Sequence, residues 1–194
     1  MIFKNLLAIL AIVSPTLLLA APTPFMEAHK KNYTVAITLI DESPEYTKAY
    51  QGVLLGLKEE GFIDGQNITI NYQNAKGDLN TAYQIAHDFV KSKPDIIIPI
   101  STPSAQAVVS ADESAHIPVV FAAVMEPFVK HSDSVTGVYG VIPLEIESTE
   151  VGYLAGRMAG IVLGGKSPGK IDIVKPKDTQ LLINAKTAEQ LNLK

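Results

Sequence analysis

The fold is decided by residues 33–61, which read YTVAITLIDESPEYTKAYQGVLLGLKEEG. Residues 33–40 are mostly apolar and β-branched, as in a strand that is buried on both faces of a parallel sheet. Residues 45–60 carry apolar side chains at three- and four-residue intervals, which predicts an amphipathic helix that Gly61 ends. A strand that leads directly into a helix is the repeating unit of an α/β protein.

The same unit recurs along the chain. Further strands are predicted at residues 68–72, 95–100, 119–123 and 135–138, and further helices at residues 79–91, with Asp78 as N-cap, and 103–115. Connections this short between strands and helices imply parallel strands joined by right-handed crossovers. We therefore expect an α/β fold in which a doubly wound parallel sheet carries helices on both faces.

The last part of the chain departs from this rhythm. Residues 150–163 predict one more amphipathic helix, rich in glycine and alanine, which should pack closely on another backbone and end at the glycine pair 164–165. Residues 171–174 and 181–184 have the composition of strands but no obvious partner, and residues 186–193 allow a final helical turn or two. These late strands are the least explained part of the expected fold.

The composition limits the function classes. The chain has 194 residues, 47% of them hydrophobic and 19% charged, which is enough for one domain with a core. Sixteen Lys and Arg against twenty Asp and Glu, without a block of like charge, argue against nucleic acid as a partner. The absence of Cys excludes disulfides, thiolate metal sites and a lipid-anchored cysteine, and the four His show no metal-ligand spacing. We expect neither a metal nor a cofactor.

The N-terminus has the pattern of a secretory signal. Lys4 precedes an apolar run at residues 6–13, and small residues follow around residue 20. The apolar stretch is broken by Pro15 and is shorter than the roughly 20 residues that span a bilayer. We therefore expect residues 1–20 to be a cleaved signal peptide, residues 21–32 to be a tether, and the mature protein to be periplasmic or extracellular.

A ligand site is expected at one edge of the sheet. Ligands of open parallel sheets bind outside the carboxyl ends of the strands, where the strand order reverses. Residues 41–45, 101–104 and 124–127 fall there. The second segment has the clearest chemistry, because Thr102 is placed to cap the following helix and Pro103 suits its first position.

The start of this helix is a candidate anion site. Free N–H groups of Ser104 and Ala105, with the hydroxyls of Ser101 and Ser104, would face the crevice and suit a carboxylate or another anion. An ordinary capped helix without a ligand explains the same residues, so the pattern leaves both interpretations open.

Catalytic patterns are weak. The carboxylates near this rim, among them Asp41 and Glu126, have no histidine or lysine placed to complete an acid–base pair. The sequence contains no Gly-x-Ser-x-Gly elbow around Ser104, no Gly-x-Gly-x-x-Gly fingerprint and no phosphate loop. We expect no catalytic residues, and a chain that binds a ligand rather than converting one.

Short sequence blocks, in order along the chain, carry a specific resemblance. The N-terminal blocks are residues 52–62 (GVLLGLKEEGF), 65–68 (GQNI), 74–78 (NAKGD), 93–97 (KPDII), 101–107 (STPSAQA), 117–124 (IPVVFAAV) and 135–138 (VTGV). The C-terminal blocks are residues 153–160 (YLAGRMAG), 176–178 (PKD) and 182–188 (LINAKTA). Together they resemble the ABC transporter substrate-binding proteins of the tryptophan or aromatic amino-acid type.

This resemblance implies the type I periplasmic-binding-protein fold, in which two lobes close on a ligand. The chain departs from the family between residues 138 and 153, because the family places a whole second lobe there and this sequence has room only for a short connection. The resemblance therefore implies one flavodoxin-like N-terminal lobe, residues 33–140 plus 148–165, and a C-terminal remnant of the second lobe, residues 166–194. Absent neighbours from that lobe would explain late strands without partners.

The resemblance also implies which residues line the ligand cleft. The family's Ser-Thr-Pro loop matches residues 101–104, residues 125–127 occupy the second cleft loop with Met and Glu where Thr and Asp are usual, and Ser43 precedes Pro44 where His-Pro is common. The ligand-binding candidates are Ser43, Ser101, Thr102, Pro103, Ser104, Ala105, Met125, Glu126 and Pro127. An amino acid or a similar small carboxylate is the expected ligand.

A member of that family would be the exported solute-binding component of an ABC importer, with an ABC permease as its partner. One lobe offers half of the usual contact with a ligand, so the product could be degenerate, or two copies could face each other as a homodimer. An exported sensor or interaction module that uses the same lobe without transport is one alternative. A flavodoxin-like regulatory domain or enzyme is another, although the export signal argues against it.

Overall fold

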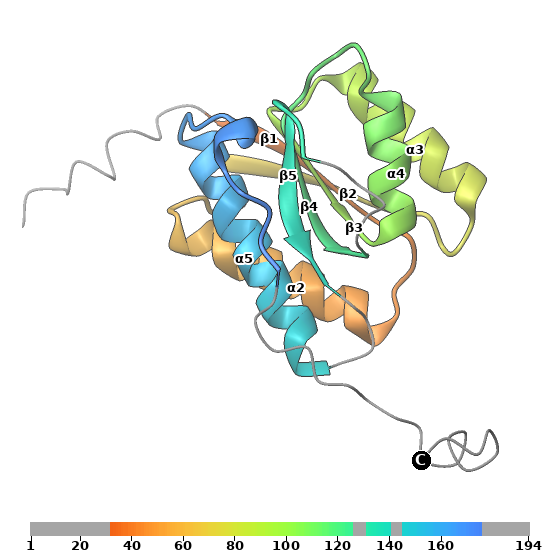
Figure 1. Ribbon diagram of the computed structural model, residues 1–194, viewed down its shortest axis with the longest axis horizontal. Coiled ribbons are helices and arrows are strands. Elements are labelled where there is room, and N and C mark those ends of the chain that lie inside the picture. Colours follow the sequence, from red (N-terminus) through yellow and green to blue (C-terminus); the bar gives the residue numbers. More distant parts are fainter. Residues whose placement is uncertain (1–31, 126–130, 141–144, 176–194) are drawn as a thin grey trace, which may run out of the picture.

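The computed structural model describes residues 32–125, 131–140 and 145–175. Within them, parallel strands form one sheet in the order β2-β1-β3-β4-β5 (Figure 1). Their bounds are Tyr33–Leu39 (β1), Ile68–Asn74 (β2), Ile96–Ile100 (β3), Val119–Val124 (β4) and Val135–Tyr139 (β5). The strand order reverses between β1 and β3, as in a doubly wound sheet.

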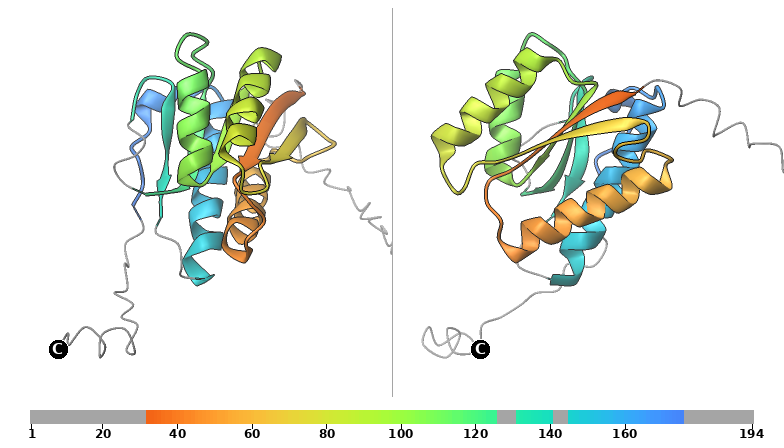
Figure 2. Two further views of the ribbon diagram at one scale, coloured as in Figure 1. Left: turned by 90° about the vertical axis from the view of Figure 1, so that its right-hand side faces the viewer. Right: turned by 180° about the vertical axis from the view of Figure 1, so that it is seen from behind.

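Helices cover both faces of the sheet. Their bounds are Pro44–Glu59 (α2), Leu79–Ser92 (α3), Thr102–Ala111 (α4) and Glu145–Leu163 (α5), with a 3₁₀ turn at Pro168–Lys170 (η1). Helices α2 and α5 lie on one face, and α3 and α4 lie on the other (Figure 2). The sheet therefore separates two sets of buried side chains, which we call the α2/α5 cluster and the α3/α4 cluster. The expected α/β fold is confirmed.

The helix ends follow local hydrogen bonds. Asp78 caps α3 as predicted, because its side chain accepts from Thr81 N at 2.6 Å. Helix α4 ends at Ala111, earlier than predicted. The reason is Asp112, whose buried carboxylate accepts from Ile117 N at 3.1 Å and turns the chain toward β4.

Helices α2 and α5 approach each other backbone to backbone. A Cβ atom added at Gly52 or Gly56 of α2 would overlap the backbone of α5, and one added at Gly152 or Gly156 of α5 would overlap the backbone of α2. The prediction that the small residues of the last helix pack closely on another backbone is therefore confirmed. The helix begins at residue 145, earlier than predicted, and the carbonyl of Thr149 lies against Gly52.

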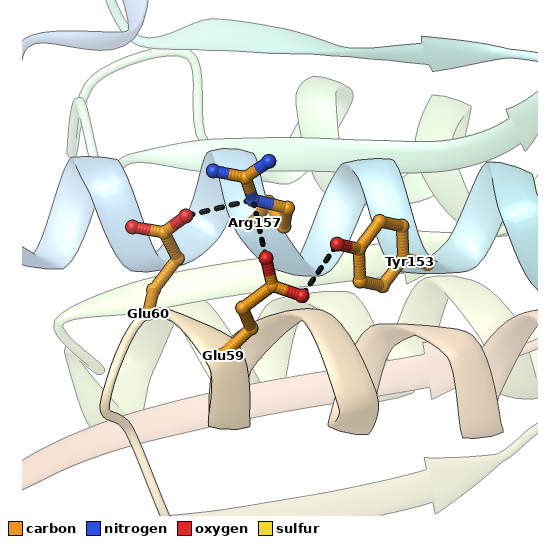
Figure 3. A network of polar contacts seen from close by, with 4 residues as sticks. All are labelled: Glu59, Glu60, Tyr153 and Arg157. Carbon is orange, nitrogen blue, oxygen red and sulfur yellow. Dashed lines mark hydrogen bonds and ion pairs between the residues drawn. The ribbon is translucent and has the colours of Figure 1, made fainter.

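A cluster of polar side chains joins the C-terminal end of α2 to α5. Tyr153 donates to the Glu59 carboxylate, and Arg157 Nε lies 2.8 Å from Glu60 Oε1 (Figure 3). The hydrogen bond to Glu59 raises the pKa of Tyr153, and the hydrogen bond to Glu60 raises the pKa of Arg157. Because α2 runs antiparallel to the strands, this cluster lies away from their carboxyl ends. The Tyr-x-x-Gly-Arg block therefore joins two helices in this structure.

The segment after α5 returns to the sheet. Val174 N donates to Gly137 O at 3.0 Å and Tyr139 N donates to Val174 O at 2.9 Å, so that Val174 pairs in parallel with Val138 of β5. The expectation that residues 171–174 lack a partner is therefore wrong. Their partner is the outer edge of β5, which is distant in sequence and which no local pattern indicates.

Several predictions fall on residues outside those that the structure describes. They are the signal peptide at residues 1–20 with nearly all of the tether, the cleft residues Glu126 and Pro127, and the segments 181–184 and 186–193. Of the helices in the described ranges, none is long and apolar enough to cross a membrane.

Candidate functional site

The candidate crevice lies at the carboxyl edge of the sheet, where the strand order reverses between β1 and β3. Turns meet there at residues 40–43 before α2, at Ser101 before α4, and at Met125 after β4. Because the strands are parallel, their carboxyl ends share this edge. The structure thus brings the described candidate residues to one end of the molecule.

Ser101 has an unusual backbone conformation. Its φ of 99° and ψ of 154° lie in a region that is essentially restricted to glycine. Ser101, and not Thr102, is the N-cap of α4, so the predicted cap is wrong by one residue. The sequence Ser-Thr-Pro-Ser offers either hydroxyl as a cap, and the turn at Ser101 starts the helix one residue earlier.

The serine hydroxyls of this turn are satisfied internally. Ser101 Oγ accepts from Ser104 N at 3.3 Å and donates to Ser104 Oγ at 3.1 Å, while Ala105 N donates to Ser101 O at 3.0 Å. Both serines are buried, with exposed fractions of 0% and 1%. The expectation of free N–H groups at Ser104 and Ala105, with both hydroxyls facing the crevice, is therefore wrong, because the capping bonds turn these groups inward.

Thr102 and Pro103 are the partly exposed residues of the same turn. Thr102 Oγ1 accepts from Met125 N at 3.0 Å, which ties the start of α4 to the turn after β4. Met125 is itself 47% exposed. These three candidates are the described residues of the two turns that are at least partly exposed.

A second strained residue lies in β4. Ala123 has a φ of 54°, and the register between β4 and β5 shifts between Ala122 and Val124, as at a β-bulge. Ser101 N donates to Ala122 O at 3.1 Å, so the bulge lies beside Ser101. Strain of this kind costs on the order of 1–3 kcal/mol per residue and gathers at functional sites. It marks the carboxyl ends of β3 and β4 as the candidate site.

The turn after β1 forms the other side of the crevice. Asp41 Oδ1 accepts from Ser43 N at 2.8 Å, which directs the chain into α2. Ser43 precedes the helix, but its hydroxyl makes no capping bond. Asp41, Glu42 and Glu45 give this side an acidic character.

Tyr46 is a residue of this edge that sequence reasoning missed. It is partly buried in the first turn of α2. Burial has the largest effect in raising the pKa of Tyr46, and the negative charges of Asp41 and Glu45 add to it. The signal that could have found it is a polar aromatic residue directly after the turn that follows a buried strand.

Two hollows lie away from this edge. One of about 200 Å³ is lined by residues of α2 and β2, among them Leu54 and Ile70. Another of about 300 Å³ lies between the end of α4 and the start of β5, with Asp112 and His116 in its wall. In the described part of the chain, no group of three or more His, Asp and Glu side chains is placed to hold a metal ion.

Comparisons with known sequences point to one family. A sequence model of the family described as ABC transporter substrate binding protein matches residues 34–145 and 126–194. The chain is also 42% identical, over 98 residues, to a tyrosine-binding protein of Clostridioides difficile strain R20291. That stretch is 50% of this chain but 28% of the relative, so the chain spans little more than a quarter of the relative's length.

Solved structures share the fold. The ligand-free, open form of a substrate-binding protein with adhesive properties from Clostridium difficile matches with a TM-score of 0.68 and 18% identity, over 84% of this chain and 95% of that chain. A conserved domain protein from Vibrio cholerae matches with a TM-score of 0.54 and 30% identity, over 75% of this chain and 57% of that chain. Together with the family match, these similarities confirm the fold class and the resemblance carried by the sequence blocks.

Proposed function

This chain belongs to the family of ABC transporter substrate-binding proteins, and we propose that it is the exported solute-binding component of an ABC importer. The proposed ligand is an amino acid or a similar small carboxylate, which the relative named as a tyrosine-binding protein supports. The proposed partner is an ABC permease. The proposed location is the periplasm or the cell exterior, because the binding proteins of ABC importers are typically exported.

The observation that carries this proposal is the pair of strained residues, Ser101 and Ala123, at the carboxyl ends of neighbouring strands. Strained backbone is retained where it positions functional atoms. Here it accompanies the hydrogen bond that joins Thr102 to Met125 at the crevice.

Ligand contact and support are assigned to different members of the candidate set. The proposed contacts are Ser43, Thr102, Pro103 and Met125, followed along the chain by Glu126 and Pro127. The buried residues Ser101, Ser104 and Ala105 hold the turn in place from behind.

We further propose that the chain supplies one wall of a cleft. Only residues 140–144 join β5 to α5, the point at which the family resemblance requires a second lobe. The family match supports this interpretation because it falls into two segments, residues 34–145 and 126–194, whose overlap includes this connection. A ligand on one wall buries roughly half of the surface that a closed two-lobe cleft would cover, so its affinity should be weak.

Titration calorimetry and thermal-shift measurements with the standard amino acids test the proposal. We expect weak, saturable binding of at least one of them. No heat and no shift with any amino acid would exclude amino-acid binding. Sedimentation equilibrium with and without ligand would reveal whether two copies complete the cleft as a homodimer.

The genes beside this one separate import from sensing. A neighbouring permease and ATPase would support the importer, whereas a neighbouring histidine kinase would support an exported sensor that uses the same lobe.

A further inference from the structure

Tyr46 lies at the end of the sheet rather than on one of its faces. Among the residues that the structure describes, it is the one partly buried hydrophobic side chain that packs against both the α2/α5 cluster and the α3/α4 cluster. The sheet separates these clusters, so a ring that contacts both must reach around the end of a strand. Tyr46 lies in the first turn of α2, directly after the turn that follows β1, so this end is the carboxyl end of β1. The ring therefore lies at the carboxyl end of β1, at the edge where the strand order reverses.

The surroundings of the ring are acidic. Burial and the negative charges of Asp41 and Glu45 raise the pKa of Tyr46, so its hydroxyl stays protonated at neutral pH. Asp41 is partly buried and is oriented by the 2.8 Å hydrogen bond that its Oδ1 accepts from Ser43 N. An aromatic ring with an oriented carboxylate in its surroundings suits an ammonium group.

We propose that Tyr46 is a ligand-contacting residue of the crevice, and that its ring and the Asp41 carboxylate together select ligands that carry an ammonium group. This inference rests on the proposed function. It adds which group of the ligand, the ammonium group, this side of the crevice recognises. A cation is attracted both by the face of the ring and by the carboxylate, and both attractions grow when the ligand excludes water. Residues 101–105, on the other side of the crevice, carry no charge.

Tyr50 provides a matched control. It lies one turn further along α2, is also partly buried, and packs against the α2/α5 cluster alone. Its ring centroid lies 4.9 Å from that of Tyr72. Burial raises the pKa of Tyr50 as it does that of Tyr46. The two tyrosines therefore differ chiefly in their position relative to the crevice.

The experiment is titration calorimetry on the purified full-length protein with the amino acid that binds most tightly, its decarboxylated amine and its deaminated acid. For tryptophan these probes are tryptamine and indole-3-propionate. The deaminated acid should bind at least about tenfold more weakly than the amino acid. Tyr46→Leu should lower the affinity for the amino acid at least about tenfold, and Tyr50→Leu should leave it within about threefold. Asp41→Asn, which keeps an acceptor for Ser43 N, should weaken the amine more than the acid.

The outcomes separate this inference from the proposed function. If no amino acid binds, the proposed function fails and the inference fails with it. If an amino acid binds but Tyr46→Leu has no more effect than Tyr50→Leu, or the deaminated acid binds as well as the amino acid, the inference is overturned and the proposed function stands.

A second measurement covers the case in which Tyr46→Leu does not fold. In protein labelled with ¹³C-tyrosine, saturating ligand should shift the ring resonance of Tyr46, assigned through Tyr46→Phe, and leave that of Tyr50 in place. A Tyr46 resonance that does not move would overturn the inference.

Discussion

Gly156 of α5 lies so close to the backbone carbonyl of Val53 in α2 that a Cβ atom at position 156 would overlap the carbonyl oxygen. Gly152 and Ala49 repeat the relationship one helical turn away. Because Gly52 of α2 lies equally close to the backbone of α5, the contact is mutual and sets one register for the helix pair. Helix α2 begins directly after the turn at residues 40–43, which forms the acidic side of the crevice. The contact between the helices therefore also fixes the position of that turn.

Gly156→Ala should destabilise the protein by about 1–3 kcal/mol, the usual cost of an overpacked contact, although alanine is the better helix former. Chemical denaturation followed by circular dichroism measures the effect. Gly164→Ala is the control, because its Cβ would lie at an ordinary distance of 3.4 Å from Gly160 O. If the two variants had equal stability, the helices would be free to move apart and the register would not be fixed.

Asp112 gives the free energy of unfolding a defined pH dependence. Burial raises the pKa of Asp112. The hydrogen bond from Ile117 N and the charge of His116 act in the opposite direction and lower it, but burial has the larger effect. The folded protein therefore holds this proton more tightly than the unfolded chain, and the stability that Asp112 contributes is lost as pH rises through its raised pKa. Asp112→Asn keeps the acceptor for Ile117 N and has no charge to bury.

The stability of Asp112→Asn relative to the wild type should therefore increase as pH rises from below the ordinary aspartate value of about 3.9 to neutrality. Urea denaturation at a series of pH values measures the difference. A difference that stays constant, or that decreases, would contradict the assignment of this carboxyl as a buried group with a raised pKa.

Ala123→Gly should be close to neutral, although it removes a buried methyl group. Glycine adopts the left-handed conformation without strain, which should stabilise the folded state by about 1–2 kcal/mol. This gain offsets the loss of the buried methyl group and the greater conformational entropy of the unfolded chain. Ala122→Gly, one residue earlier in the same strand, has no such relief and should cost about 1–2 kcal/mol. Thermal unfolding of both variants gives the comparison, and equal losses would show that Ala123 is not strained.

The sheet could be predicted from the sequence because its strands are buried on both faces. The run at residues 96–100 is entirely buried and reads as continuously apolar, and the run at residues 33–39 does so for most of its length. The pairing of Val174 with Val138 could not be predicted. A single bridge between positions far apart in sequence leaves no periodic pattern.

The location of the candidate site could be predicted from the sequence, but the hydrogen bonds of its turns could not. Parallel strands place the turns of Ser43, Thr102 and Met125 at one edge whatever the details of each turn. The cap of α4 depends on the φ of Ser101, which the local sequence does not determine. The position of Tyr46 across the end of β1 depends on the packing of both faces of the sheet.

Thr102→Val tests whether the bond between the two turns serves ligand binding. Valine keeps the shape of threonine but loses the acceptor for Met125 N. The loss should lower the free energy of unfolding by about 0.5–1.5 kcal/mol or less. The cost is small because Met125 is half exposed and water can replace the lost hydrogen bond. Hydrogen exchange at the Met125 amide should become faster, and ligand affinity in calorimetry should fall, because the turn after β4 is no longer held to α4. Ser92→Ala is the control: it removes one hydrogen bond, to Phe89 O at 2.8 Å, at the opposite end of the sheet. If both variants lowered affinity equally, or if Met125 exchanged at the wild-type rate in Thr102→Val, the link between the turns would have no part in binding.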